Sequence, residues 1–360
     1  MKALKEALAQ AQQDVLDQEA ARALYEQADL PTLGQLAHAA RLRHNPEPVV
    51  TYAVDRNINY TNVCVSRCAF CAFCRDRDHP EAYVMDRETL EKKCDETLAL
   101  GGTHILYQGG LHPGLDLWWH EERVRFMRQK GLHVHGFSPP EIVFLAERSG
   151  LSIAGVLERL VRAGLGSIPG GGAEILSDRV RQQISPRKAS TSQWLEVMET
   201  AHGLGLKTTA TMMFGHVETV EDRLLHLFAV RKLQEKTEGF TAFIPWPYQP
   251  GPGIVRAGPT GGAAYLRMLA LSRLVLHNVP HVQASWVTQG AAIGQVALHF
   301  GADDLGSTMI EENVVAAAGV SHRLSEAQMV HLIESAGFRA RQRDVLYRPV
   351  SCDPEVQGSC

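Results

Sequence analysis

The chain has 360 residues, of which 45% are hydrophobic and 21% are charged, and this composition is typical of a folded globular protein rather than a disordered one. Its formal net charge of −4 offers no basic surface for nucleic acid. The sequence shows neither an apolar run long enough to span a membrane nor the pattern of a signal peptide. We therefore expect a cytoplasmic protein that binds neither nucleic acid nor membrane.

Residues 1–49 are predicted to form a helical extension ahead of the main domain. Helical periodicity runs to about Arg43, with an interruption at Pro31. The turn sequence Asn45-Pro46-Glu47-Pro48 then ends the helical pattern.

From residue 50 onwards, candidate strands alternate with helical segments. The candidate strands are 54–60, 104–108, 133–137, 165–168, 207–213, 240–244 and 281–287, with a further one near 304–309. Between them, Asp86 is placed to cap one helix, and Ser190 with Gln193 forms a capping box at another. This alternation predicts an α/β fold with a parallel sheet, and the number of strands favours a TIM-type (β/α) barrel over 50–313. A doubly wound open sheet is the alternative, although the first turn after a strand lacks a GxGxxG sequence.

Residues 314–350 are predicted to form a small C-terminal α/β appendage. Ser325 and Gln328 make a further capping box before an apolar helical face that ends at Gly337. Residues 341–347 follow as a candidate strand, and 351–360 are expected to be a polar tail.

Four of the seven cysteines lie in one short segment after the first candidate strand. In a reducing compartment, clustered thiols usually bind metal or carry out redox chemistry. Cys64, Cys68 and Cys71 form a C-x3-C-x2-C run, and each thiolate can hold one iron of a 4Fe–4S cluster, which leaves the fourth iron open for chemistry. Cys74 is expected to be an extra thiol, although it could instead complete a closed electron-transfer cluster. A structural zinc site is disfavoured because a second C-x2-C pair is absent.

With Phe70 before its third cysteine, this run resembles the CxxxCxφC motif of the radical S-adenosylmethionine superfamily, in which φ is aromatic. The resemblance implies that the open iron binds the amino and carboxylate groups of S-adenosylmethionine. One electron from the reduced cluster would then cleave this cofactor to methionine and a 5′-deoxyadenosyl radical. It also implies a radical S-adenosylmethionine barrel and an electron donor such as reduced flavodoxin or ferredoxin.

The same resemblance assigns cofactor contacts to the ends of the strands. Gln108-Gly109-Gly110 matches the glycine-rich segment that receives the methionine amino group, although Leu111 stands where the superfamily usually has an acid. Glu174 matches the carboxylate that binds the ribose hydroxyls. Met213 matches the residue that covers the adenine, although a buried strand end is an equally good interpretation.

Other candidate site residues follow strand ends, where barrels carry their functional groups. Trp246 and Tyr248 lie in a proline-rich segment that predicts a stiff loop, which would present both rings to a flat substrate. His112 is a further candidate substrate contact. The candidate proton acceptors are His216, Asp304 and Glu311.

Segments outside the cluster loop narrow the resemblance. Residues 170–176, 243–250 and 300–313 are similar to the radical enzymes of menaquinone biosynthesis, in particular to the dehypoxanthine futalosine cyclases. This similarity implies that a carbon radical at the substrate ribose C4′ adds to the benzoate ring, and that loss of one proton and one electron restores aromaticity. Aminofutalosine synthases and deazaflavin-forming synthases share the cluster loop and the barrel, and they remain alternatives.

Overall fold

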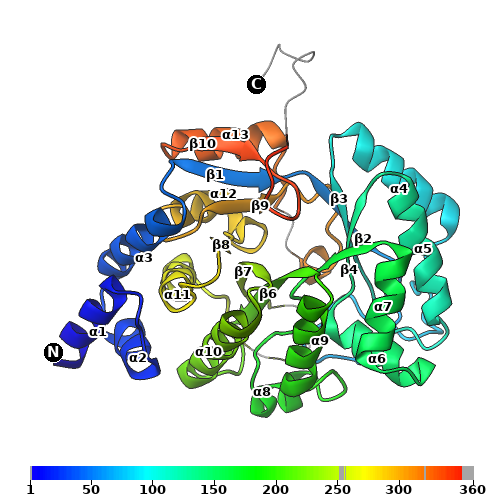
Figure 1. The fold of residues 1–360 in the computed structure, drawn as a ribbon, viewed down its shortest axis with the longest axis horizontal. Coiled ribbons are helices and arrows are strands. Elements are labelled where there is room, and N and C mark those ends of the chain that lie inside the picture. The colour runs from blue at the N-terminus through cyan, green and yellow to red at the C-terminus, as the bar shows by residue number, and fades with distance from the viewer. Residues whose placement is uncertain (1, 251–254, 256, 320–321, 351–360) are drawn as a thin grey trace.

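The structure, a computed structural model, describes residues 2–250, 255, 257–319 and 322–350. Its centre is a curled sheet of seven parallel strands in the order β2-β3-β4-β5-β6-β7-β8 (Figure 1). The strands are β2 (Asp55–Asn59), β3 (His104–Gln108), β4 (His133–Gly136), β5 (Leu165–Ile168), β6 (Lys207–Phe214), β7 (Phe240–Pro247) and β8 (His281–Val282). The predicted α/β fold is confirmed, as a partial TIM-type barrel.

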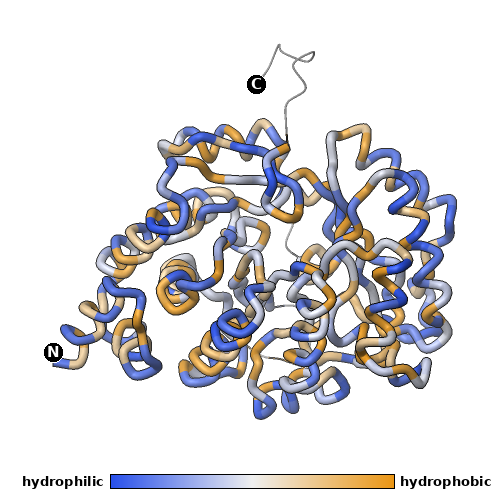
Figure 2. Tube along the Cα trace, viewed as in Figure 1, coloured by the Kyte–Doolittle hydropathy of each residue, from blue (hydrophilic) through white to orange (hydrophobic). Residues whose placement is uncertain are grey.

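Helices cover the outer face of this sheet (Figure 1). They are α4 (Arg87–Ala99), α5 (Leu117–Gln129), α6 (Pro139–Ser149), α7 (Ile153–Ala163), α8 (Asp178–Ile184), α9 (Thr191–Gly203), α10 (Val220–Thr237), α11 (Gly262–Val275) and α12 (Trp286–Ala297). In α7, Ser152 accepts a hydrogen bond from the N–H of Gly155, and Gly164 ends the helix in a left-handed conformation. The buried residues of α7 recur at helical spacing, and Figure 2 shows the same mixing of hydrophobic and hydrophilic residues along the outer helices.

A second, three-stranded parallel sheet spans the open side of the curl. Its order is β10 (Arg339–Gln342), β1 (Val49–Ala53) and β9 (Asp304–Ser307). Strand β1 runs through Val54 directly into β2, and a single bridge between Gln283 and Asp304 joins the end of β8 to β9. The two edge strands of the curled sheet are therefore connected through β1 and β9.

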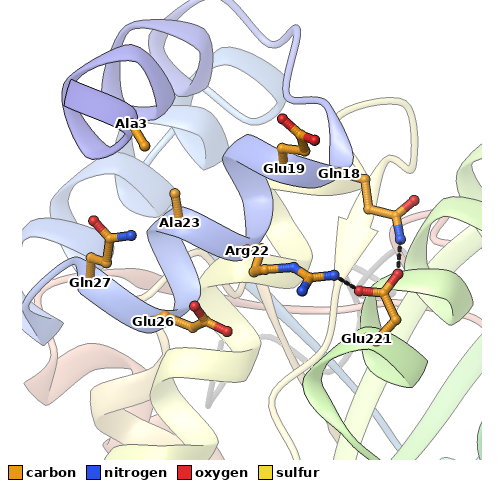
Figure 3. Close-up of a pocket in the computed structure, with 8 residues that line it drawn as sticks. All are labelled: Ala3, Gln18, Glu19, Arg22, Ala23, Glu26, Gln27 and Glu221. Atoms are coloured by element: carbon orange, nitrogen blue, oxygen red, sulfur yellow. Dashed lines mark hydrogen bonds and ion pairs between the residues drawn. The ribbon is translucent and has the colours of Figure 1, made fainter. Parts of the chain in front are cut away.

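The N-terminal segment forms three helices, α1 (Lys2–Gln12), α2 (Gln18–Gln27) and α3 (Leu30–His44). Helix α3 packs against α11. Helix α2 contacts the start of α10, where Arg22 and Gln18 both point to the Glu221 carboxylate (Figure 3). Ion pairs of this exposed kind contribute little stability, so the packing of apolar side chains holds the extension in place.

Most predicted strands are confirmed within a few residues, as are the Asp86 cap and both capping boxes. Helix α13 (Glu326–Ser335) starts at the second box. Strand β10 begins before the predicted 341–347, and β1 was not predicted. The division at residues 50, 314 and 351 remains a prediction, and the predicted tail 351–360, with Cys352 and Cys360, lies outside the described residues. None of the described helices is long and apolar enough to cross a membrane.

Two local predictions are wrong. The predicted strand 281–287 ends at Val282, because the N–H of Ala284 already turns to the carbonyl of Asp304 in β9 and α12 starts at Trp286. The first part of the predicted proline-rich loop, 243–247, is instead the end of β7, which continues beside β6 to Pro247, whereas 248–250 lie outside any strand.

Candidate active site

A cavity of about 330 Å³ lies inside the curled sheet. It extends from Asp55 and His104 at the starts of β2 and β3 to Gln108 at the end of β3. Barrel interiors are usually filled with branched apolar side chains, whereas polar groups from several elements line this one. They include Asp55, Asn57, His104, Gln108, His135, Glu174, Thr209, Thr211, Gln283, Ser285, Thr288 and Glu312.

The four clustered cysteines lie on the loop after β2, and all are half-buried free thiols. Backbone hydrogen bonds hold this loop, because the N–H of Val65 donates to the carbonyl of Leu111 (3.1 Å) and that of Ala69 donates to Ile184 (2.7 Å). The loop is thereby attached both to the glycine-rich segment and to the end of α8.

Cys74 lies against Cys64 within this loop. Its Sγ is 3.4 Å from the carbonyl oxygen of Cys64, and a hydrogen bond from the Cys74 thiol lowers the pKa of Cys64. Burial raises the pKa of Cys68, while Lys188 acts in the opposite direction.

The donor set fits a 4Fe–4S cluster. In the described part of the chain, no three His, Cys, Asp or Glu side chains converge on a point where a single metal ion would sit. A 4Fe–4S cluster does not require such convergence, because each thiolate binds its own iron. The soft, reduced and partly accessible thiols of Cys64, Cys68 and Cys71 are the ligands that such a cluster takes.

The glycine-rich segment packs tightly against the cluster loop. A Cβ on Gly110 would lie 2.2 Å from the carbonyl oxygen of Val63, and one on Gly109 would lie 2.5 Å from the Tyr60 ring. The N–H of Gly109 donates to the Glu141 carboxylate (3.2 Å), whose pKa burial raises to about 7. Only glycine permits this close approach of the two backbones.

Glu174 is a buried carboxylate that lines the cavity. Its Oε1 accepts a hydrogen bond from Lys188 (2.8 Å), and Lys188 in turn lies over the ring of Phe70, 5.5 Å from its centre. Its Oε2 is buried without a hydrogen-bond partner among the described residues, although Arg181 lies 3.7 Å away. A buried acceptor without a donor is costly, so this oxygen fits a site that receives ligand hydroxyls.

Of the predicted substrate and adenine contacts, only Trp246 lines the cavity. Met213 is buried at the end of β6, with 1% of its surface exposed. The hydroxyl of Tyr248 donates to the carbonyl of Val255 (3.1 Å), and Nδ1 of His112 accepts from the N–H of Gly114 (2.9 Å). Their assigned roles remain predictions.

The three predicted proton acceptors are absent from the described lining of the cavity. Both ring nitrogens of His216 are engaged, because Nε2 bonds the carbonyl of Met213 (3.0 Å) and Nδ1 accepts from the N–H of Val217 (2.8 Å). Burial also lowers the pKa of His216.

Asp304 and Glu311 are both held by cations. Asp304 forms a bidentate pair with Arg343, at 2.5 and 2.8 Å. Burial raises the pKa of Glu311, but hydrogen bonds from Lys93 and Asn313 outweigh this effect. The net result is a pKa below the ordinary value, so the carboxylate stays ionised. These contacts connect Asp304 and Glu311 to distant elements. The assignment of His216, Asp304 and Glu311 as proton acceptors remains a prediction.

The cavity also contains ionisable side chains that the sequence reasoning missed. At its floor, which we define as Asp55, His104, Arg343 and Tyr347, the Asp55 carboxylate lies 3.0 Å from Nε2 of His104. His135, which pairs with Leu106 two residues further along β3 than His104, also lines the cavity. The sequence does carry a signal for these side chains, because polar residues stand at alternate positions of strands that are flanked by helices. Side chains at alternate positions of a strand point to the same face, so these polar side chains all point into the interior of the barrel.

Comparison with known proteins agrees with this geometry. The radical SAM superfamily matches residues 58–229, and the CofH/MqnC C-terminal region matches residues 237–355. Cyclic dehypoxanthine futalosine synthases from Halalkalibacterium halodurans and Streptomyces coelicolor are each 43% identical, over 92% and 90% of this chain and 90% and 83% of their own lengths. A 5-amino-6-(D-ribitylamino)uracil–L-tyrosine 4-hydroxyphenyl transferase from Methanothermobacter thermautotrophicus is 41% identical over 84% of this chain and 85% of its own.

Solved structures share the fold at low identity. Methylornithine synthase (PylB) has a TM-score of 0.72 at 16% identity, and the match covers 93% of this chain and 97% of that one. The FeFe-hydrogenase maturase HydG from Carboxydothermus hydrogenoformans has a TM-score of 0.75 at 15% identity, covering 96% and 81%.

The sequence families, the relatives and the three-cysteine loop lead to the same conclusion, and they confirm the resemblance inferred from the motif. The chain belongs to the radical S-adenosylmethionine superfamily and is an enzyme that uses a 4Fe–4S cluster and S-adenosylmethionine.

Proposed function

We propose that this enzyme converts dehypoxanthine futalosine to its cyclic form in menaquinone biosynthesis. The observation that carries the proposal is the 43% identity to two cyclic dehypoxanthine futalosine synthases over at least 90% of this chain. The polar lining of the cavity supports it, because a ribose-bearing substrate needs hydrogen-bond partners that an apolar barrel would not supply.

In this proposal, Cys64, Cys68 and Cys71 bind the cluster and Phe70 packs beside it. When bound, the cluster and S-adenosylmethionine supply a 5′-deoxyadenosyl radical. Glu174 accepts hydrogen bonds from the cofactor ribose through Oε2, which lacks a partner among the described residues. The proposed cofactor contacts are completed by Gln108, Gly109, Gly110 and Met213.

The substrate lies along the barrel axis, and Trp246 packs against its aromatic ring. The reaction removes one hydrogen from C4′ of the ribose, joins that carbon to the benzoate ring and releases one proton and one electron. Enclosure by the barrel keeps water and other hydrogen donors away from the carbon radical. Reduced flavodoxin or ferredoxin would deliver the electron that first reduces the cluster.

A second candidate function is transfer of the tyrosine hydroxyphenyl group to 5-amino-6-(D-ribitylamino)uracil. It is favoured by the relative from Methanothermobacter thermautotrophicus, which is 41% identical over 84% of this chain. Aminofutalosine synthesis is a third candidate, which rests only on the resemblance of the cluster loop to that of the aminofutalosine synthases.

Parallel assays separate these functions. Anaerobically reconstituted and reduced enzyme is incubated with S-adenosylmethionine and each candidate substrate, and the products are analysed by mass spectrometry. Cyclisation predicts a product two hydrogens lighter than dehypoxanthine futalosine, with equal amounts of methionine and 5′-deoxyadenosine. A product that retains the adenosyl group, or transfer of a hydroxyphenyl group to the uracil, would refute the proposal.

A further inference from the structure

In the proposed reaction, ring closure releases a proton inside the cavity, and among the described residues of the cavity wall one imidazole has a free nitrogen. Strand β4 places His135 in the wall. Nδ1 of His135 bonds the Ser167 hydroxyl, but no described residue hydrogen-bonds Nε2, which is also absent from the enclosed polar atoms that lack a partner. Nε2 is therefore open to the cavity.

A single hydroxyl connects His135 to a second imidazole. Oγ of Ser167, on the neighbouring strand β5, lies 2.7 Å from Nδ1 of His135 and 2.7 Å from Nε2 of His133. A serine hydroxyl carries only one hydrogen, so at least one of the two imidazoles donates to it. If His135 donates to Ser167 and Ser167 donates to His133, Nε2 of His135 keeps a lone pair directed at the cavity.

The second imidazole lies closer to the outside of the barrel. His133 is half-buried at the start of β4, and its Nδ1 is neither bonded by a described side chain nor enclosed. Its ring occupies the space over Gly166, where a Cβ would lie 2.4 Å from Cε1. The three side chains therefore form a continuous hydrogen-bonded row from the cavity to the amino-terminal end of the barrel.

We propose that His135, Ser167 and His133 form a proton relay that carries the proton released by ring closure out of the cavity. This inference rests on the proposed cyclisation. After the bond between C4′ and the ring has formed, the C–H bond of the attacked ring carbon breaks, its proton binds Nε2 of His135 and its electron pair stays in the ring. One electron must also leave the ring to restore its aromaticity, and the 4Fe–4S cluster, when bound, would be its acceptor.

The relay moves one proton in and one proton out. The Nδ1 proton of His135 passes to Ser167, the Ser167 proton passes to Nε2 of His133, and the Nδ1 proton of His133 passes to water. Both imidazoles are neutral before and after the transfer, and reorientation of the rings and the hydroxyl restores the starting tautomers. Burial lowers the pKa of His135 far below its usual value and that of His133 to about 4, which favours such a transfer over a stored imidazolium.

The test compares two products of the same turnover. Hydrogen abstraction, which forms 5′-deoxyadenosine, precedes proton loss, which forms the cyclic product. In His135→Asn and Ser167→Ala we expect the ratio of cyclic product to 5′-deoxyadenosine to fall at least tenfold. We also expect a deuterium isotope effect on the cyclic product when the attacked ring carbon carries deuterium. An unchanged ratio, or an equal loss of both products, would overturn the relay.

His202→Asn is the matched control. Its imidazole also bridges two hydroxyls, of Thr237 (2.7 Å) and Thr208 (2.8 Å), but it does not belong to the described lining of the cavity. This variant is expected to keep the product ratio of the wild type. A fall as large as in His135→Asn would show that the ratio reports general damage, and it would overturn the relay.

A second measurement needs neither substrate nor cluster. NMR of the ¹⁵N-labelled histidines in the full chain is expected to show Nε2 of His135 without a proton from pH 8 to pH 5. A proton on that nitrogen would overturn the relay. If the wild type cleaves S-adenosylmethionine but forms no cyclic product, the proposed function fails, and the tautomer measurement still decides whether His135 can accept a proton.

Discussion

Glu174 combines an ion pair to Lys188 with one carboxylate oxygen that lacks a hydrogen-bond partner among the described residues. Replacing it by Gln keeps its size but removes the charge that strengthens hydrogen bonds from ribose hydroxyls. Glu174→Gln is expected to weaken S-adenosylmethionine binding by about 1.5–3 kcal/mol, or roughly ten- to a hundredfold, with the iron content unchanged. Equilibrium dialysis measures this affinity.

Glu121→Gln provides the control for that measurement. Glu121 is also a buried carboxylate paired with a cation, Arg159 (2.6 Å), but it lies on α5 outside the described lining of the cavity. Its substitution is expected to leave the cofactor affinity unchanged. Equal affinities in the wild type and Glu174→Gln would place the ribose contact on another residue.

Cys74 is the residue that separates an open cluster from a closed one. Because its thiol points to the carbonyl oxygen of Cys64, we expect it to support the loop without binding iron. Cys74→Ala should retain the cluster, whereas Cys68→Ala should lose it, as measured by iron content and electron paramagnetic resonance. Cys94→Ala removes a buried thiol on α4, outside the cluster loop, and its iron content is the reference for the other two variants. Loss of iron in Cys74→Ala together with retention in Cys68→Ala would refute the assignment.

At the scale of elements, the close approach of β5 and β6 depends on Gly170. A Cβ there would lie 2.6 Å from both Cα of Ala210 and the backbone nitrogen of Thr211, and backbone atoms cannot rotate away. Gly170→Ala is therefore expected to lower the free energy of unfolding by about 1–3 kcal/mol. Denaturant unfolding of the cluster-free protein measures this change.

Gly203 in α9 is the matched glycine, because an added Cβ would meet no other atom within 4 Å. There alanine has the better helix propensity, so Gly203→Ala is expected to stabilise the protein by up to about 1 kcal/mol. A similar loss of stability in both variants would show that the close approach at Gly170 is unimportant.

The end of β7 shows what a local pattern can and cannot predict. Prolines remove N–H donors, which favoured a loop over 243–250. In the structure, the carbonyl of Phe243 bonds Gln283 beside β8, and the N–H of Tyr248 bonds Phe214 beside β6. The N–H positions of Pro245 and Pro247 therefore face the side where β8 has already ended, so no hydrogen bond is lost. Only the length of the neighbouring strand reveals this tolerance.

The candidate site was also only partly predictable from the sequence. The spacing of Cys64, Cys68 and Cys71 identifies the cluster loop because all three ligands are local in sequence. The cavity floor was not predictable, because Asp55 and Arg343 meet only after the whole barrel has formed. Strand β1 was missed for the same reason, since its partners β9 and β10 lie near the other end of the chain.

At the scale of the whole molecule, buried neutral histidines make stability depend on pH. Burial lowers the pKa of His226 to about 3 and that of His202 to about 4, whereas both titrate near 6.5 in the unfolded chain. Between these values the unfolded state binds more protons, so the free energy of unfolding falls as the pH falls from 6.5 towards 4. Each such histidine contributes roughly 1 kcal/mol per pH unit.

Urea unfolding at pH 7, 6 and 5 checks this slope. His226→Asn is the informative variant, because an amide oxygen can still accept the hydrogen bond that the N–H of Leu176 donates to Nδ1 (3.0 Å). This variant is expected to reduce the slope of the unfolding free energy against pH by the contribution of one histidine, roughly 1 kcal/mol per pH unit. An unchanged slope would mean that His226 has the same pKa in both states.

The pairing of β1 with β10 also has a consequence for synthesis of the protein on the ribosome. Val49 leaves the ribosome early, but its partner Arg339 follows only after the entire curled sheet. The cluster loop and the glycine-rich segment are thus synthesised well before Arg343 and Tyr347, which complete the cavity floor. A nascent chain would present these thiols to iron, oxygen and other thiols while the barrel is still open. Late closure therefore leaves a period for inserting the cluster, during which the cysteines are also vulnerable to oxidation.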